Sequence, residues 1–133
     1  MATKCKKIQT LTVPLDAKPG ALSHVYGAFR EAGVNILASW AYEMGPGQAQ
    51  AHFFAADTTK AKEVLTKLGK KATVDDAVYA EGEDRVGVYS ELLGKVAKAG
   101  VNIEATDAFS VNGKFATVFF SKDTPALCKA LDC

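Results

Sequence analysis

Hydrophobic and polar positions follow two periods along this chain, and the two periods predict its secondary structure. Residues 8–15 and 35–42 alternate between apolar and polar types, which indicates strands with one buried face. Residues 21–32 repeat apolar side chains at every third or fourth position, which indicates an amphipathic helix. The first half is therefore predicted to contain, in order, a strand at 8–15, a helix at 21–32, strands at 35–42 and 48–55, a helix at 58–68 and a strand at 71–74.

The second half repeats this order except at its end. Asn112-Gly113, between two alternating segments, is a strong hairpin signal. The predicted elements are a strand at 77–82, a helix at 87–99, strands at 102–110 and 114–121, and a helix at 124–131. The sequence reaches Cys133 where a fourth strand would begin. We therefore expect the second unit to lack a C-terminal strand of its own, and the empty position to stay open or be filled by another segment, such as one from a partner chain.

An internal repeat underlies this shared order. Residues 32–36, Ala-Gly-Val-Asn-Ile, recur unchanged as residues 99–103, and Phe53-Phe54 recurs as Phe119-Phe120. A βαββαβ unit forms a four-stranded antiparallel sheet with both helices on one face. The repeat thus predicts an α+β fold of two ferredoxin-like units, residues 5–76 and 77–133. Because roughly 60 residues bury little surface alone, we expect the units to pack together and the chain to form a homodimer.

Composition and charge exclude several classes of protein. The 133 residues carry 16 Lys and Arg against 15 Asp and Glu, a net charge of +1 without the basic stripe typical of nucleic-acid binding. No apolar run reaches the roughly 18 residues of a membrane span. The chain opens without the apolar core of a signal peptide, so a cytoplasmic protein is expected. Three cysteines without CxxC spacing favour neither a disulfide framework nor a zinc site.

The candidate catalytic groups are few. His24 and His52 stand apart from cysteines and acidic residues at metal-ligand spacing, and no nucleophile or phosphate-loop motif is present. Asp75-Asp76 lies at the junction of the two repeats, where we expect a solvated pair. The sequence therefore predicts a protein that is not an enzyme and has no catalytic residues, metal site or cofactor.

A glycine stands at the predicted strand-to-helix turn of each repeat, at Gly20 and Gly87. A helix N-terminus offers unpaired backbone N–H groups, and glycine lets a small carboxylate approach them. Asn35 and Asn102 each begin the following strand, two residues after a helix-ending glycine. Such an asparagine can bond a ligand, or it can cap its own turn. The residues alone leave both interpretations open.

These motifs resemble the ACT domain. The resemblance rests on residues 11–22 (LTVPLDAKPGAL) followed by residues 32–36, and on residues 80–87 (AEGEDRVG) followed by residues 99–103. It covers nearly the whole chain, and residues 19–23 are also similar to the regulatory subunit of acetolactate synthase.

The resemblance implies an allosteric role in which an amino acid binds at an interface between two ACT units. The family places an Asn or Asp three residues before the turn glycine; here the second copy has Asp84 and the first has Ala17, while Val86 replaces the second copy's proline. The ligand-binding residues that the resemblance and the turn glycines indicate are Gly20, Ala21, Leu22, Asn35, Ile36, Asp84, Gly87, Val88, Tyr89, Asn102 and Ile103.

Two functions follow as hypotheses. The first is a non-catalytic regulatory protein that binds a small amino acid and acts on an enzyme of amino-acid metabolism. The second is a scaffold or interaction module without a ligand, or a regulatory subunit of an amino-acid biosynthetic enzyme.

Overall fold

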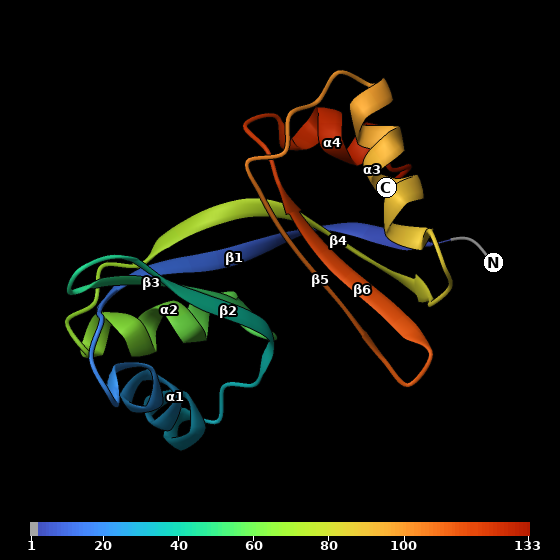
Figure 1. The fold of residues 1–133 in the computed structure, drawn as a ribbon. Coiled ribbons are helices and arrows are strands. Elements are labelled where there is room, and N and C mark those ends of the chain that lie inside the picture. Colours follow the sequence, from blue (N-terminus) through green and yellow to red (C-terminus); the bar gives the residue numbers. More distant parts are fainter. Residues whose placement is uncertain (1–2) are drawn as a thin grey trace. The chain divides into compact units, whose positions relative to one another are not determined.

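The computed structural model describes residues 3–133, and its elements follow the predicted order (Figure 1). None of its helices is long and apolar enough to cross a membrane. The elements are β1 (Lys4–Asp16), α1 (Ala21–Ala32), β2 (Ile36–Gly45), β3 (Gln48–Ala55), α2 (Thr58–Lys67), β4 (Thr73–Glu83), α3 (Val88–Lys98), β5 (Ala105–Val111), β6 (Lys114–Phe120) and α4 (Thr124–Ala130).

The chain divides into two compact units, and both β1 and β4 contribute to each of them. One unit is Gln9–Asp75, and the other joins residues 3–8 to Asp76–Cys133. The repeat in the sequence placed residues 5–8 with the first unit instead. The difference arises because β1 continues without a turn through residues 4–8, so that its two ends belong to different units.

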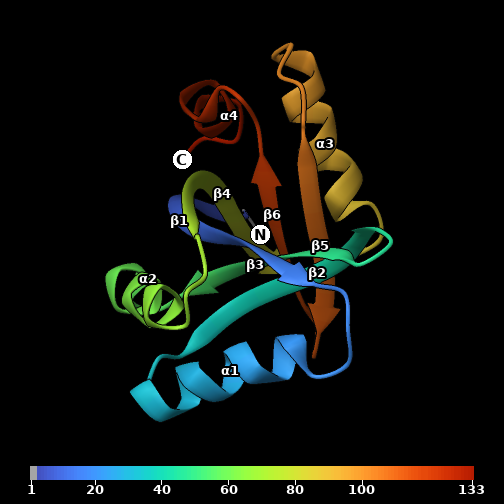
Figure 2. The same cartoon turned by 90° about the vertical axis from the view of Figure 1, so that its left-hand side faces the viewer.

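The first unit has the strand order β2-β3-β1-β4, with both helices on one face of the sheet (Figure 2). Its core is aromatic. The fully buried Phe53 of β3 meets Phe29 and Tyr26 of α1 edge-on, with ring centroids 5.1 and 5.6 Å apart. These contacts explain the apolar stripe of α1, although Leu22 at its beginning is 38% exposed and lies outside the core.

The second unit has the order β1-β4-β6-β5, in which residues 3–8 lie beside β4. A Cβ placed on Gly82 would come within 3.3 Å of the Thr3 backbone, and Lys7 Nζ lies 3.7 Å from Asp76 Oδ2. These two contacts require an antiparallel arrangement. The expectation that another segment fills the missing fourth strand is confirmed, and the segment is the beginning of this same chain.

The division between the two compact units falls between Asp75 and Asp76, but the chain does not turn there. The strands expected at 71–74 and 77–82 are one continuous strand, β4, which contains both aspartates. Asp75 is half-buried and accepts a 2.6 Å hydrogen bond from Thr12 Oγ1, so it is not a solvated surface group. The sequence did not predict one continuous strand, because two adjacent acidic residues between apolar segments are typical of a turn.

Turn glycines and helix caps explain most of the residues that recur. Gly33 ends α1 with a φ of 72°, and Asn112 and Gly113 have φ values of 52° and 78° in the hairpin. Asp57-Thr58 in the first repeat recurs as Asp123-Thr124 in the second, and both aspartates are N-caps. Asp57 Oδ1 accepts the N–H of Lys60, and Asp123 Oδ1 accepts that of Ala126, each at 3.0 Å.

A chain of polar side chains crosses the first unit's sheet on the face turned away from the helices. Thr12 Oγ1 donates to Asp75 Oδ2 at 2.6 Å and lies 3.0 Å from His52 Nδ1, while His52 Nε2 lies 2.9 Å from the Tyr42 hydroxyl. Because the one hydroxyl hydrogen of Thr12 goes to Asp75, the oxygen accepts from Nδ1–H. Tyr42 then donates to Nε2, and Trp40 stacks on the imidazole at 5.2 Å.

Burial sets the protonation of this histidine. His52 is only 8% exposed, and burial lowers its pKa below the ordinary value, against the opposing charge of Asp75. The unfolded chain, whose histidine has a pKa of about 6.5, therefore binds a proton at a higher pH than the folded chain does. The contribution of neutral His52 to the free energy of unfolding is complete above the pKa of the unfolded chain's histidine. It is lost as the pH falls from there toward the lower pKa of His52 in the folded chain.

We expect the free energy of unfolding of the wild type to fall between about pH 7 and about pH 5 more steeply than that of His52→Gln. Urea denaturation at a series of pH values measures this. His24→Gln is the matched control, because His24 is exposed on α1, and it should keep the wild-type slope. An equal slope in His52→Gln and the wild type would contradict the assignment.

Candidate ligand-binding site

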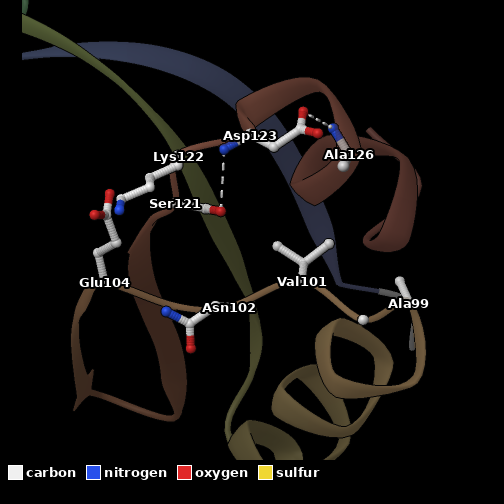
Figure 3. A pocket seen from close by; sticks show the side chains of 9 residues that line it. Ala99, Val101, Asn102, Glu104, Ser121, Lys122, Asp123 and Ala126 are labelled. Atoms are coloured by element: carbon white, nitrogen blue, oxygen red, sulfur yellow. Dashed lines mark hydrogen bonds between the residues drawn. The ribbon is translucent and has the colours of Figure 1, made fainter.

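A pocket of about 500 Å³ lies in the second unit around Asn102 (Figure 3). Two loops build it: one follows α3 and carries Asn102 and Glu104, and the other follows β6 and carries Lys122. The remaining lining residues are Ala99, Gly100, Val101, Ser121, Asp123 and Ala126.

Backbone bonds fix both loops. Gly100 has a φ of 74° and donates its N–H to Ala97 O at 3.0 Å, which ends α3 and turns the chain toward Asn102. On the other loop, the Asp123 N–H donates to Ser121 Oγ at 3.3 Å, and the Asp123 carboxylate caps α4. The Asp123 carboxylate is thus used within the protein.

The polar groups of the pocket suit a small zwitterion. Glu104 supplies a carboxylate, Lys122 an ammonium group and Asn102 an amide with both donors and an acceptor. Figure 3 shows the Glu104 and Lys122 side chains turned toward one another across the gap between the two loops. All three residues are exposed, so a molecule entering the pocket meets both signs of charge within a small space.

A second hollow, of about 350 Å³, lies in the first unit at the predicted turn. It is lined by the end of β1, by the turn, and by Ala21 and Leu22 together with Ala41 and Glu43 of β2. Gly20 has a φ of 86°, as a turn glycine should, but the Ala21 N–H already donates to Lys18 O at 3.3 Å. Helix geometry leaves the Leu22 N–H without an intrahelical acceptor.

The corresponding turn of the second unit is more strongly held. The Val88 N–H donates to Arg85 O at 3.2 Å, and the Val88 side chain is buried. Tyr89 packs on Phe119 and bonds Thr106 through its hydroxyl at 2.6 Å. Two side chains flank this turn: Asp84 is exposed next to Gly87, and Arg85 holds Glu91 in a bidentate pair whose hydrogen bonds lower the pKa of that carboxyl.

The structure does not bring the predicted glycines and asparagines of one repeat together. Gly20 and Asn35 flank opposite ends of α1, which has 12 residues and is therefore about 18 Å long. Gly87 and Asn102 flank α3 in the same way. Ile36, which begins β2, and Ile103 each pack against the core of their own unit.

Sequence reasoning found Asn102 but not Glu104, Ser121 or Lys122. The one signal in the sequence that points to the loop after β6 is the recurrence of Asp57-Thr58 as Asp123-Thr124, which shows that this loop belongs to the repeat. Nothing in that pairing shows that a lysine next to the cap faces the loop that carries Asn102. Among the described residues, no group of three or more His, Cys, Asp or Glu side chains is arranged to hold a metal ion.

Comparisons of sequence and of structure give different results. No protein-family model matches the sequence, and no curated protein matches it. Solved structures do match. Protein BT0572 from Bacteroides thetaiotaomicron is similar over 96% of this chain and 88% of its own, with a TM-score of 0.88 and 20% identity.

Two further matches are to proteins of the aspartate kinase system. The regulatory subunit of aspartate kinase from Thermus thermophilus aligns over 99% of this chain and 95% of its own, with a TM-score of 0.73 and 18% identity. A structure of aspartokinase alpha and beta subunits aligns over 100% and 99%, with a TM-score of 0.68 and 18% identity. The predicted α+β fold of two ferredoxin-like units is thereby confirmed, and the chain has the fold of the Thermus thermophilus regulatory subunit.

Proposed function

We propose that this chain is a non-catalytic regulatory protein that binds a free amino acid and acts on an enzyme of amino-acid metabolism. The observation that carries the proposal is a pocket with both signs of charge in a chain that shares its fold with a regulatory subunit of aspartate kinase. In this proposal Glu104 and the Asn102 oxygen accept from the ligand's ammonium group, and Lys122 donates to its carboxylate.

The turn residues belong to the proposal in a supporting role. Leu22 and Tyr89 lie in the first turns of α1 and α3, where backbone N–H groups and the helix dipole favour a carboxylate. Asn35 stands in the first repeat where Asn102 stands in the second. We propose that these positions form further contacts to the same class of ligand.

A ligand-free scaffold is the alternative, and one observation favours it. The N–H groups of Ala21 and Val88, which would bind a carboxylate, are used by carbonyls of their own turns. A chain that kept the fold but no longer bound a ligand would have this arrangement.

Calorimetry with the twenty amino acids should find one that binds, and Asn102→Ala should weaken it. Losing one hydrogen bond to a charged group costs about 1.5–3 kcal/mol, or roughly ten- to a hundredfold in Kd. Lys122→Ala should weaken binding similarly. Lys114→Ala, which removes the same charge from the β6 strand of the same unit, should not.

Two results would contradict this proposal at different levels. Equal binding by the wild type, Asn102→Ala and Lys122→Ala would place the ligand elsewhere. If none of the twenty amino acids binds the wild type, the ligand-free scaffold is the better account.

We further propose that the chain forms a homodimer through β2. β2 stands at the end of the first unit's strand order, and Leu37 and Met44 on it are 51% and 55% exposed. Its ten residues include one charged side chain, Glu43, so little on this edge opposes pairing with a second strand.

Light scattering should give twice the mass of one chain for the wild type. Leu37→Lys combined with Met44→Lys should give the mass of one chain, because charges on an edge strand oppose pairing. Phe109→Lys combined with Val111→Lys is the matched control on β5, the strand at the end of the second unit's order, and it should remain dimeric. The reverse pattern would assign the interface to β5.

A further inference from the structure

All three cysteines of the chain meet in one place, although 123 residues separate Cys5 from Cys128. Cys5 lies in the part of β1 that completes the second unit, Cys128 lies on α4, and Cys133 follows α4. The Cys5 thiol donates to Leu131 O at 3.1 Å, and the Cys133 N–H donates to Cys128 O at 2.9 Å. The first bond joins residues 126 positions apart, so folding of the unit brings Cys5 to the end of α4, where the second bond holds Cys133 beside Cys128.

The thiols also lie near one another. Cys5 Sγ bonds the carbonyl of Leu131, two residues before Cys133, and the Cys133 backbone is bonded to that of Cys128. All three are free thiols, and Cys133 is exposed while the other two are half-buried against the core. A reagent in solution therefore reaches one member of the cluster directly, and the other two thiols lie near that member.

We propose that Cys5 and Cys133 form a redox modification site, in which a small disulfide of the glutathione class converts the two thiols into an intrachain disulfide. Cys133 is the exposed member, and the bond from the Cys5 thiol to Leu131 O brings Cys5 within two residues of it along the segment after α4. In this proposal Cys128, five residues before Cys133, keeps its thiol.

The reaction is a thiol–disulfide exchange in two steps. The Cys133 sulfur, after losing its proton, attacks one sulfur of the small disulfide; that S–S bond breaks, and one small thiolate leaves and takes up a proton. The Cys5 sulfur then loses its proton and attacks Cys133 in the mixed disulfide, which releases the second small thiol. The protein loses two hydrogen atoms and two electrons, and the small disulfide is reduced to two thiols.

The surroundings of the cluster set the rate rather than the outcome. Partial desolvation raises the pKa of Cys5 and of Cys133, and the neighbouring thiols raise the pKa of Cys133 further. Since the thiolate is the attacking form, exchange is slow at neutral pH and accelerates as the pH rises.

A bridge here acts on the element that both units share. It ties the first residues of β1 to the segment after α4 and so prevents β1 from separating from the second unit. The closed loop spans nearly the whole chain, and such long loops give the largest restriction of the unfolded state. Oxidation should therefore raise Tm by on the order of 10 °C.

The test is to incubate the purified chain with oxidised glutathione at a series of pH values and to read intact mass and peptide maps without reduction. We expect the wild type and Cys128→Ser to lose two hydrogen atoms in mass, to show a Cys5–Cys133 linked peptide and to gain in Tm. Cys5→Ser should instead retain a glutathione adduct on Cys133, with no gain in Tm.

Four outcomes would overturn the proposal. They are a bridge between Cys128 and Cys133, stable glutathione adducts on the wild type, disulfides between chains on a non-reducing gel, and no reaction across the pH series. If Cys5→Ser folds poorly, Cys128→Ser still tests the proposal, because this variant must form the Cys5–Cys133 bridge and show the same increase in Tm as the wild type.

Discussion

The pairing of residues 3–8 with β4 is the interaction on which the rest of the structure depends. The second repeat contributes three strands of its own, which leaves one side of β4 without a neighbour. The beginning of β1 fills that position, while the remainder of the same strand lies at the centre of the first unit, next to β3. Each unit is therefore complete only because β1 and β4 are long enough to serve both.

This sharing has an energetic consequence. A unit of about 65 residues buries a limited core, and a missing strand would expose both backbone groups and apolar side chains of that core. Filling the position with a covalently attached segment costs less entropy than recruiting a second chain, because the segment is already held near its site. The Lys7–Asp76 pair is half-exposed and weak, so backbone pairing and the packing of Cys5 hold the segment.

Local patterns made much of the fold predictable. The 3.6-residue stripe of α1 gave its bounds without error, and the recurrence of residues 32–36 revealed the duplication. Gly33 and Asn112-Gly113 were predictable because their positive φ values have few side-chain solutions. The partner of residues 4–8 was not predictable, since Lys4, Lys6 and Lys7 obscure the alternation and the pairing is set by a strand some seventy residues away.

The candidate site divides in the same way. Asn102 could be singled out because it recurs, whereas Glu104 and Lys122 have no equivalent signal and meet only once two loops fold against each other. The series of hydrogen-bonded side chains that runs from Asp75 to Tyr42 likewise spans four strands. Each of these residues, taken alone in the sequence, looks like an ordinary surface or strand residue. Side chains brought together by non-local pairing are invisible to periodicity.

Hydrogen exchange of the backbone amides, read by mass spectrometry on the reduced protein, tests the shared strand most directly. If residues 4–8 complete the second sheet, a peptide covering them should exchange about as slowly as peptides from β4 and β6, because its N–H groups are held by β4. If that peptide exchanges at the rate of an unstructured chain while β4 and β6 stay protected, residues 4–8 do not complete the second unit and the account is contradicted.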